Sequence, residues 1–400
     1  MRQRTTNLRN MVSQLHKKPA RIPGTKWRGL QSDSNERTAH LVQAAALCSR
    51  AVYRDNLPHI IPELPGYTVK ERHWIEPIED GSGKAAALFE IAPANPSAQR
   101  TIIIAVRGMG LVDWLVDNDL ATCPDLLNFH EPNGASVPKV HRGFAQCAKS
   151  LVPALLHHIK AALYECQLQG RAVEIVFTGH SSGGAIASLL FCHFLTRHVL
   201  GYDTNDLETT RVEKGHKAYK WHHADARPSK PTLSCIGFGC PPMLDADISL
   251  GLIDLFPTSS FLLGTFLSFV NDGDPIPRMD TAYAAALAGI WHRVGGSRCA
   301  TEDELPEFKP PPLSLNGLGH LVVLFVKDQE FKENHEEVDK YEKLMACHLD
   351  SRNLGLQAWA NVSAHSVNQY VEWATLIGNG SFNGRVNWAR VTDQDKCICM

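Results

Sequence analysis

Residues 174–190 read EIVFTGHSSGGAIASLL, and this stretch decides the fold. An apolar segment of strand length, residues 174–178, runs into a glycine-rich turn, and a helical segment, residues 182–198, follows without a gap. Gly179, Ser181 and Gly183 complete the pattern G-x-S-x-G, which is weak alone but specific when it joins a buried strand to a helix. We therefore predict that Ser181 is a nucleophile on a sharp strand-to-helix turn.

The spacing of the glycines has a steric reason. A serine on so tight a turn has a strained backbone, and side chains two residues to either side would collide with the neighbouring strand and helix. The amino terminus of the helix lies beneath the serine and favours negative charge there. The plainer alternative is a glycine-rich turn without chemistry.

Strands and helices alternate along the rest of the chain. The strands are expected at residues 86–92, 101–106, 174–178, 233–238, 266–270 and 320–326, and the helices at 40–53, 140–169, 182–198, 328–345 and 364–377. The first two strands form a hairpin. This order predicts an α/β fold with a mostly parallel central sheet, flanked by helices on both faces.

Composition narrows the class of protein further. The formal net charge of -2 gives no reason to expect a nucleic acid partner. The 11 cysteines show no CxxC pair and no zinc spacing, and Cys192 and Cys235 lie in apolar runs, where we expect buried thiols. No uncharged apolar run reaches the length of a membrane span.

A serine nucleophile needs two backbone N–H donors for the developing oxyanion. Ser182, directly after the nucleophile, supplies one. Residues 101–109, TIIIAVRGM, read as a buried strand that stops at Arg107 and Gly108, so the second donor is expected to be the N–H of Met109.

Four segments together resemble the fungal-type class 3 lipases. They are TIIIAVRGM, DWLVD at 113–117, VHRGF at 140–144 and FTGHSSGG at 177–184, in the family's order and approximate spacing. The resemblance covers roughly residues 45–377 and implies an α/β-hydrolase fold and the hydrolysis of lipid esters. The family usually has Thr or Ser in place of Met109, so a weaker or differently completed oxyanion hole is expected. It usually has Leu in place of Ser182, where only the N–H is required.

The resemblance also implies a lid over residues 110–118. Leu111, Trp114 and Leu115 form an apolar face between charged positions, which can cover an apolar cleft in water and turn to a lipid surface. The alternative is an ordinary surface helix that packs Trp114 into the core.

The acid should follow a buried strand in this fold, and the histidine should come later in the chain. Residues 274–277, DPIP, fit the family's acid pattern, so Asp274 is preferred and Asp272 is the alternative. Among the later histidines, His365 precedes the last amphipathic helix as in the family, while His320 and His348 are the alternatives. The resulting Ser–Asp–His mechanism needs no metal ion and no organic cofactor.

Both ends of the chain carry expectations about location. Residues 1–31 hold eight basic and no acidic residues, and no secretory signal is visible, so we expect an intracellular protein with a disordered basic leader. An organelle transit sequence or a tail attracted to anionic lipid are the alternatives. The ending KCICM matches a prenylation pattern at Cys397, although Cys399 replaces the usual aliphatic residue.

These observations predict a leader at residues 1–35, one lipase-like domain at 36–380 with a polar insertion at 202–232, and a tail at 381–400. The expected function is the hydrolysis of mono-, di- or triacylglycerol esters, with a lipid ester as substrate and peripheral membrane contact. The alternatives are a short-chain or feruloyl-type esterase and a non-catalytic lipid-binding protein on the same fold.

Overall fold

The computed structural model describes residues 33–53, 67–76, 84–93, 99–108, 120–122, 138–196, 231–245, 262–296, 310–326, 344–349, 351–357 and 359–379. The leader up to residue 32, the insertion up to residue 230 and the tail from residue 381 lie outside these ranges.

The described strands form one large central sheet in the order β1-β2-β3-β6-β7-β8-β9-β10. They are β1 (Tyr67–Ile75), β2 (Ala86–Pro93), β3 (Arg100–Val106), β6 (Val173–His180), β7 (Thr232–Phe238), β8 (Leu262–Asn271), β9 (His320–Val326) and β10 (Leu344–Leu349). The strands from β3 to β9 run parallel, and antiparallel partners lie at both edges. The mostly parallel sheet and the hairpin of β2 and β3 are therefore confirmed.

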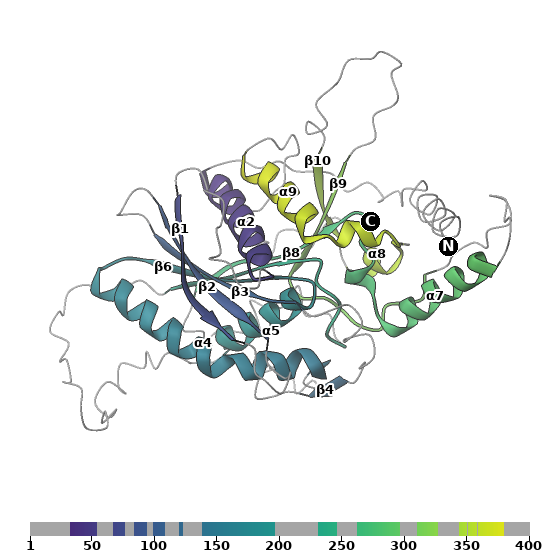
Figure 1. The fold of residues 1–400 in the computed structure, drawn as a ribbon, viewed down its shortest axis with the longest axis horizontal. Helices are drawn as coiled ribbons and strands as arrows, with labels where there is room; N and C mark the ends of the chain where they lie inside the picture. Colours follow the sequence, from purple (N-terminus) through teal and green to yellow (C-terminus); the bar gives the residue numbers. More distant parts are fainter. Residues whose placement is uncertain are drawn as a thin grey trace, which may run out of the picture.

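Helices cover both faces of this sheet (Figure 1). One face carries α2 (Asp33–Ala51) and α9 (Val367–Gly378), and the other carries α4 (Arg142–Leu168) and α5 (Ser182–Thr196). The remaining elements are α7 (Thr281–Gly296), α8 (Ser351–Gly355), the 3-10 turns η2 (Ile276–Arg278) and η4 (Val362–His365), and a small sheet of β4 (Leu120–Thr122) and β5 (Lys139–His141).

The layered core explains the apolar strands. In β3, Ile102 and Ile104 pack into the cluster with α4 and α5, whereas Ile103 and Ala105 pack into the cluster with α2 and α9. Because successive side chains of a strand point to opposite faces, both faces must be apolar when both are covered. Each large apolar side chain buried in this way contributes roughly 1.5–3 kcal/mol.

The register of the parallel strands brings their carboxyl ends to one edge. Val106 lies opposite Gly179, His180 opposite Phe238, and Phe238 opposite Phe269. Loops that follow these strands therefore meet at the same edge of the sheet, which is where α/β folds place ligands.

Two sequence expectations need correction. The helix expected at 328–345 is wrong at its end, because Leu344 and Met345 begin β10, which pairs with β9; residues 328–343 lie outside the described residues. The leader expected at 1–35 ends earlier, because α2 begins at Asp33. Acidic residues such as Asp33 and Glu36 favour the first turn of a helix, so the helix extends into this polar segment.

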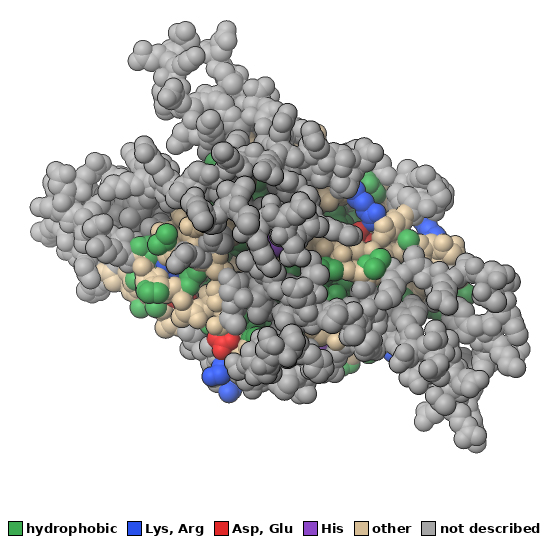
Figure 2. All heavy atoms as spheres, turned by 180° about the vertical axis from the view of Figure 1, so that it is seen from behind, with side chains coloured by type: hydrophobic (Ala, Val, Ile, Leu, Met, Phe, Trp, Pro, Cys, Tyr) green, Lys and Arg blue, Asp and Glu red, His purple; other side chains and the backbone are tan. Residues whose placement is uncertain are grey.

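Hydrophobic side chains appear in small separate groups on the side seen in Figure 2. None of the described helices is both long and apolar enough to cross a membrane. The described cysteines, Cys192 and Cys235 among them, are buried and free, as expected.

Candidate active site

Ser181 occupies a strained turn between β6 and α5. Its φ is 59°, and it is the only non-glycine residue with positive φ among those described. A side chain at Gly179 would collide with the backbone of Gly183, and one at Gly183 with the carbonyl oxygen of Val106. Left-handed backbone costs a residue other than glycine about 1–2 kcal/mol, so the surrounding packing holds the serine there. The structure thus contains the tight strand–turn–helix that the G-x-S-x-G spacing predicts.

The Ser181 side of this turn is nearly enclosed. The sequence suggests a hydroxyl that stands free of the sheet, but Ser181 is only 4% exposed. The predicted lid, with Leu111, Trp114 and Leu115, lies outside the described residues.

Asp274 and His365 form a buried acid–imidazole pair. His365 Nδ1 lies 2.9 Å from Asp274 Oδ2, and Asp274 is completely buried. The Tyr370 hydroxyl donates to the same carboxylate oxygen at 2.6 Å, and the Ile276 N–H donates to Oδ1 at 2.9 Å. Because both carboxylate oxygens accept hydrogen bonds, the acid has a fixed orientation toward the imidazole.

Hydrogen bonds also join the turn after β8 to the turn that carries His365. The Asn271 side chain donates to the carbonyl of Ala364 at 2.8 Å, and the Asn361 N–H donates to the carbonyl of Gly273 at 2.9 Å. Backbone hydrogen bonds of this kind hold two turns at a constant separation. The distance between Asp274 and His365 therefore depends on the backbone as well as on the two side chains.

Arg278 stabilises the segment that precedes His365. This fully buried guanidinium donates to the carbonyl oxygens of Gln357, Gly355 and Pro311 and lies over the ring of Tyr283. Burial lowers its pKa, but its ordinary pKa is so high that it keeps its charge. Arg278 thus anchors the segment that leads to the histidine.

The serine turn meets the acid–imidazole pair at Gly239. Ser181 N–H donates to the carbonyl of Phe238 at 2.9 Å, and Gly239 follows with a φ of 59°. A side-chain carbon at Gly239 would lie 2.9 Å from Asp274 Oδ2 and 3.0 Å from the His365 ring. The structure therefore brings the predicted nucleophile, acid and base to one small region at the carboxyl edge of the sheet.

Comparison with known proteins gives the family. Residues 103–284 match the model of the family described as Lipase (class 3), and this range contains the end of β3, the Ser181 turn and Asp274. The part of the chain that carries the Ser181 turn and Asp274 is therefore of the class 3 lipase type. The chain is a carboxylic ester hydrolase of the α/β-hydrolase fold, and its class of substrate is lipid esters.

Solved structures similar to this lipase are lipases of fungi. The lipase from Rhizopus microsporus var. chinensis is 15% identical with a TM-score of 0.45, covering 87% of this chain and 92% of that one. The triacylglycerol lipase from Penicillium expansum is 16% identical with a TM-score of 0.43, covering 81% and 90%. The Rhizomucor miehei lipase propeptide complex is 18% identical with a TM-score of 0.37, covering 68% and 74%. No curated protein sequence matches this chain.

The alternative acid and base residues of this lipase lie elsewhere. Asp272 is exposed on the turn after β8. His320 begins β9 opposite Leu267, about four residues or roughly 13 Å below the strand ends. His348 lies within β10 opposite Val322, so it also falls inside the sheet. Only His365 among these histidines is paired with Asp274 in the structure.

Of the two predicted oxyanion donors, one lies within the described residues. Ser182 begins α5 and is fully buried, while Met109 and the prenylation candidate Cys397 lie outside the described residues. A side-chain carbon at Gly183 would lie 2.8 Å from the Gly108 N–H nitrogen. The end of β3 therefore closely approaches the start of α5. Within the described part of the chain, no group of three or more His, Cys, Asp or Glu is placed to hold a metal ion.

Sequence reasoning missed two kinds of residue around this site. Tyr370 lies within the helix predicted at residues 364–377, where the sequence indicates no role for its hydroxyl, but this hydroxyl binds Asp274. His180 was expected only as the variable residue of G-x-S-x-G, but its ring contacts His365. Both residues carry a polar group on a face of their segment that is otherwise buried. A polar group that is buried needs a hydrogen-bond partner, so this pattern could have indicated their contacts.

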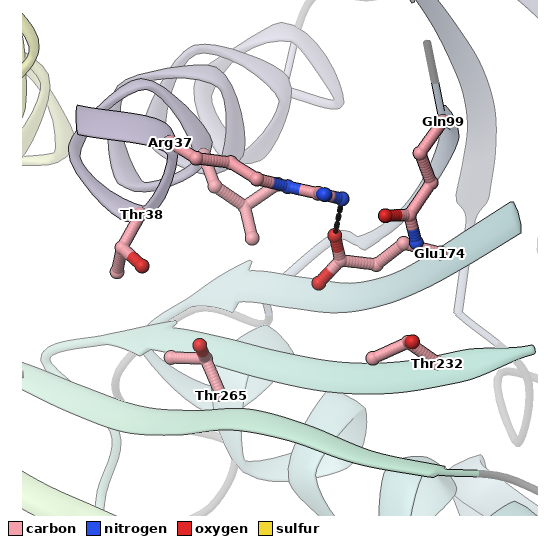
Figure 3. A pocket seen from close by; sticks show the side chains of 7 residues that line it. Arg37, Thr38, Gln99, Glu174, Thr232 and Thr265 are labelled. Carbon is pink, nitrogen blue, oxygen red and sulfur yellow. Dashed lines mark hydrogen bonds and ion pairs between the residues drawn. The ribbon is translucent and has the colours of Figure 1, made fainter. Parts of the chain in front are cut away.

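A second polar cluster lies at the opposite edge of the sheet, where the parallel strands begin. Glu174, at the start of β6, binds the guanidinium of Arg37 from α2 (Figure 3). It also accepts a hydrogen bond from Ser234 Oγ at 2.7 Å. This ion pair borders a cavity of about 150 Å³ that Gln99 and Thr265 also line. The cluster joins α2 to the sheet away from the Ser181 turn.

Proposed function

We propose that this lipase cleaves mono-, di- or triacylglycerol esters through an acyl-enzyme on Ser181. The observation that carries the proposal is the 2.9 Å hydrogen bond between His365 Nδ1 and Asp274 Oδ2, beside a serine held at a φ of 59°. A base that is oriented by an acid next to an activated hydroxyl is the arrangement that acyl transfer requires.

The first half of the reaction forms the acyl-enzyme. His365 uses Nε2 to take the proton from the Ser181 hydroxyl, since Nδ1 is bound to Asp274. Ser181 Oγ then attacks the ester carbonyl, and the imidazolium returns its proton to the leaving alcohol. The Asp274 carboxylate orients the ring and stabilises its cation. Tyr370 and the Ile276 N–H keep that carboxylate in place.

The negative charge on the substrate oxygen needs donors during both halves of the reaction. The N–H groups of Ser182 and Met109 are proposed to supply them, and the amino terminus of α5 adds its positive partial charge. A water molecule, deprotonated by His365, then attacks the acyl group and releases the fatty acid. Ser181 recovers its proton from His365.

Access to Ser181 is proposed to open at a lipid surface. Only 4% of the Ser181 surface is exposed, which supports a site that opens before an ester enters. Leu356 and Val362, which are 69% and 50% exposed, lie on the segment that leads to His365. Exposed apolar side chains at this edge support peripheral contact with a lipid–water interface.

A fluorophosphonate probe tests the nucleophile, because it labels only an activated serine. Wild type should be labelled, and Ser181→Ala should not. Ser188→Ala is the matched control, since Ser188 lies on the same helix with its hydroxyl bound to the Gly184 carbonyl. An unlabelled but folded wild type would leave the non-catalytic alternative. A labelled Ser181→Ala would reject the assignment of the nucleophile.

The substrate class is tested by varying the physical state of the ester. An acylglycerol lipase that opens at a surface should gain activity sharply once a short-chain triacylglycerol exceeds its solubility. A short-chain or feruloyl-type esterase should instead follow simple saturation, with no rise at that concentration. Rates with monomeric and emulsified substrate at equal total concentration decide between them.

A further inference from the structure

Tyr53 and His180 form a polar pair beside the serine turn that the proposed mechanism does not use. His180 ends β6 and directly precedes Ser181, and Tyr53 follows the last turn of α2. Their rings meet edge-on with centroids 6.0 Å apart. His180 is only 7% exposed, and burial raises the pKa of Tyr53 to about 12. Buried polar groups so close to a reaction centre need a reason.

The contacts of His180 fix the position of its ring proton. Its Nε2 lies 2.7 Å from the backbone carbonyl oxygen of His365, and a carbonyl can only accept. Nε2 therefore carries the proton and donates it. In the neutral ring, Nδ1 is then an acceptor, and the Tyr53 hydroxyl lies 3.3 Å from it. A rigid chain of polar contacts thus runs from Tyr53 through His180 to the backbone of His365.

Tyr53 also joins this chain to the oxyanion strand. The one hydroxyl proton of Tyr53 can be donated to His180 Nδ1 or to the backbone carbonyl oxygen of His180, which lies 3.1 Å from the hydroxyl, and the backbone of Gly108 lowers the pKa of the same hydroxyl. A side-chain carbon at Gly108 would collide with the Tyr53 hydroxyl and lie 2.8 Å from the His180 carbonyl oxygen. One phenol therefore binds the end of β3 and the residue before the nucleophile.

The two imidazoles near Ser181 differ in their electrostatic surroundings. The ring centroids of His180 and His365 are 4.5 Å apart, and Tyr370 lies 5.6 Å from His180. Burial and the nearby His365 lower the pKa of His180 to about 3, whereas His365 has the Asp274 carboxylate as its partner. A second cation at this distance would oppose the protonated His365 that the reaction needs.

We propose that Tyr53 and His180 are positioning residues, which hold the end of β3, the serine turn and the His365 backbone in one register. This inference rests on the proposed function and deepens it. The pair touches neither substrate nor reacting atoms. It acts through the placement of Gly108, Ser181 and His365, each of which contributes to a different part of the reaction.

The first test removes only the hydroxyl, with Tyr53→Phe. A loss of alignment at the reaction centre should lower kcat for ester hydrolysis about 10- to 100-fold while KM stays within about twofold. The labelling rate with fluorophosphonate should fall in parallel. Tyr67→Phe is the matched control, because Tyr67 packs against α2 beside His40 at the opposite edge of the sheet. It should keep the wild-type kcat.

The second test asks whether the donor at His180 matters. His180→Gln keeps a neutral N–H donor that can reach the His365 carbonyl, whereas His180→Leu has none. We expect His180→Gln to retain about tenfold more kcat than His180→Leu. Thermal unfolding of both variants shows whether they fold. Equal kcat in the two folded variants would overturn the role of the donor.

A third measurement needs no variant to fold. The ¹⁵N spectrum of the wild-type imidazoles should contain one ring that carries its proton on Nε2 and stays neutral from pH 8 to pH 5. For the ring assigned to His180, a proton on Nδ1, or conversion to the cation within this pH range, would overturn the proposal. The proposed function is tested separately: an inactive, unlabelled wild type rejects the function, whereas an active wild type with an unchanged Tyr53→Phe rejects only the positioning pair.

Discussion

Each edge of the parallel sheet holds a buried carboxylate, Glu174 at one edge and Asp274 at the other, and the two have different partners. Glu174 at the amino edge binds the guanidinium of Arg37 and the hydroxyl of Ser234. Asp274 at the carboxyl edge binds the imidazole of His365 and the hydroxyl of Tyr370. Both carboxylates are therefore satisfied, as buried charges must be.

The difference lies in the cation. A guanidinium keeps its proton throughout the accessible pH range, so the pair at Glu174 can anchor α2 to the sheet but cannot move a proton. An imidazole gains and loses a proton near neutral pH, so the pair at Asp274 can serve as a base and then as an acid. The Ser181 turn, with its strained backbone, lies at this second edge alone. The partner therefore determines whether a buried carboxylate can take part in proton transfer.

The largest fall in kcat is expected from a change at Asp274. In Asp274→Asn the amide cannot hold the imidazole in the required tautomer, so we expect kcat to fall by about 10⁴-fold. The control is Asp272→Asn, which changes the exposed acid two residues away and should leave kcat within about twofold of wild type. Steady-state ester hydrolysis measures both. If the two variants were equally impaired, Asp274 would have no special role.

Tyr370→Phe removes one hydrogen-bond donor from the Asp274 carboxylate. His365 and the Ile276 N–H remain on Asp274, so we expect a fall in kcat of about tenfold rather than a complete loss. The Asn271 N–H also loses its acceptor, which should lower the free energy of unfolding by about 1 kcal/mol. Urea unfolding and kcat are measured on the same preparation. A variant with wild-type kcat would mean that Tyr370 serves only the fold.

Acid should destabilise the carboxyl edge through His180. Its pKa is about 3 in the folded protein and 6.5 in the unfolded chain. Between these values the unfolded chain binds more protons, so stability is full above pH 6.5 and falls as the pH falls. The expected loss from this group is about 1 kcal/mol between pH 6.5 and 5.5.

Urea unfolding of wild type and His180→Gln across that range isolates the effect. The pKa values of His158 and His320 are also lowered, but both residues are present in both proteins and cancel in the difference. The variant should show a flatter dependence on pH than wild type. Parallel curves would show that His180 is not the group responsible.

The sequence predicted the parts of this molecule that depend on local patterns. Apolar runs covered on both faces, such as residues 101–106 and 320–326, became central strands because nothing else buries so many branched side chains. The turn at Ser181 followed from two glycines whose missing side chains allow backbones to touch. The choice of Asp274 and His365 followed from the resemblance to the class 3 lipases, and the structure places them 2.9 Å apart.

The rest depends on contacts between distant residues, which local patterns do not contain. β1 mixes charged and apolar residues because it lies at the edge of the sheet, where its side chains are partly exposed. Nothing in the local sequence distinguishes Arg278 from a surface arginine, yet it is fully buried and donates to three backbone carbonyl oxygens. Glu174 appeared to be the polar start of a strand, and its partner Arg37 is 137 residues away.

The smallest effect on stability and on kcat is expected from Glu174→Gln. The amide oxygen can still accept from Ser234, and Arg37 is 47% exposed, so water can replace its lost partner. We therefore expect the free energy of unfolding to fall by less than about 1 kcal/mol and kcat to stay within about twofold of wild type. Urea unfolding at low and high salt measures the first, because the small electrostatic part should shrink as salt rises. A large fall in kcat would mean that the amino edge communicates with Ser181 along β6, and the two carboxylates would then no longer have separate roles.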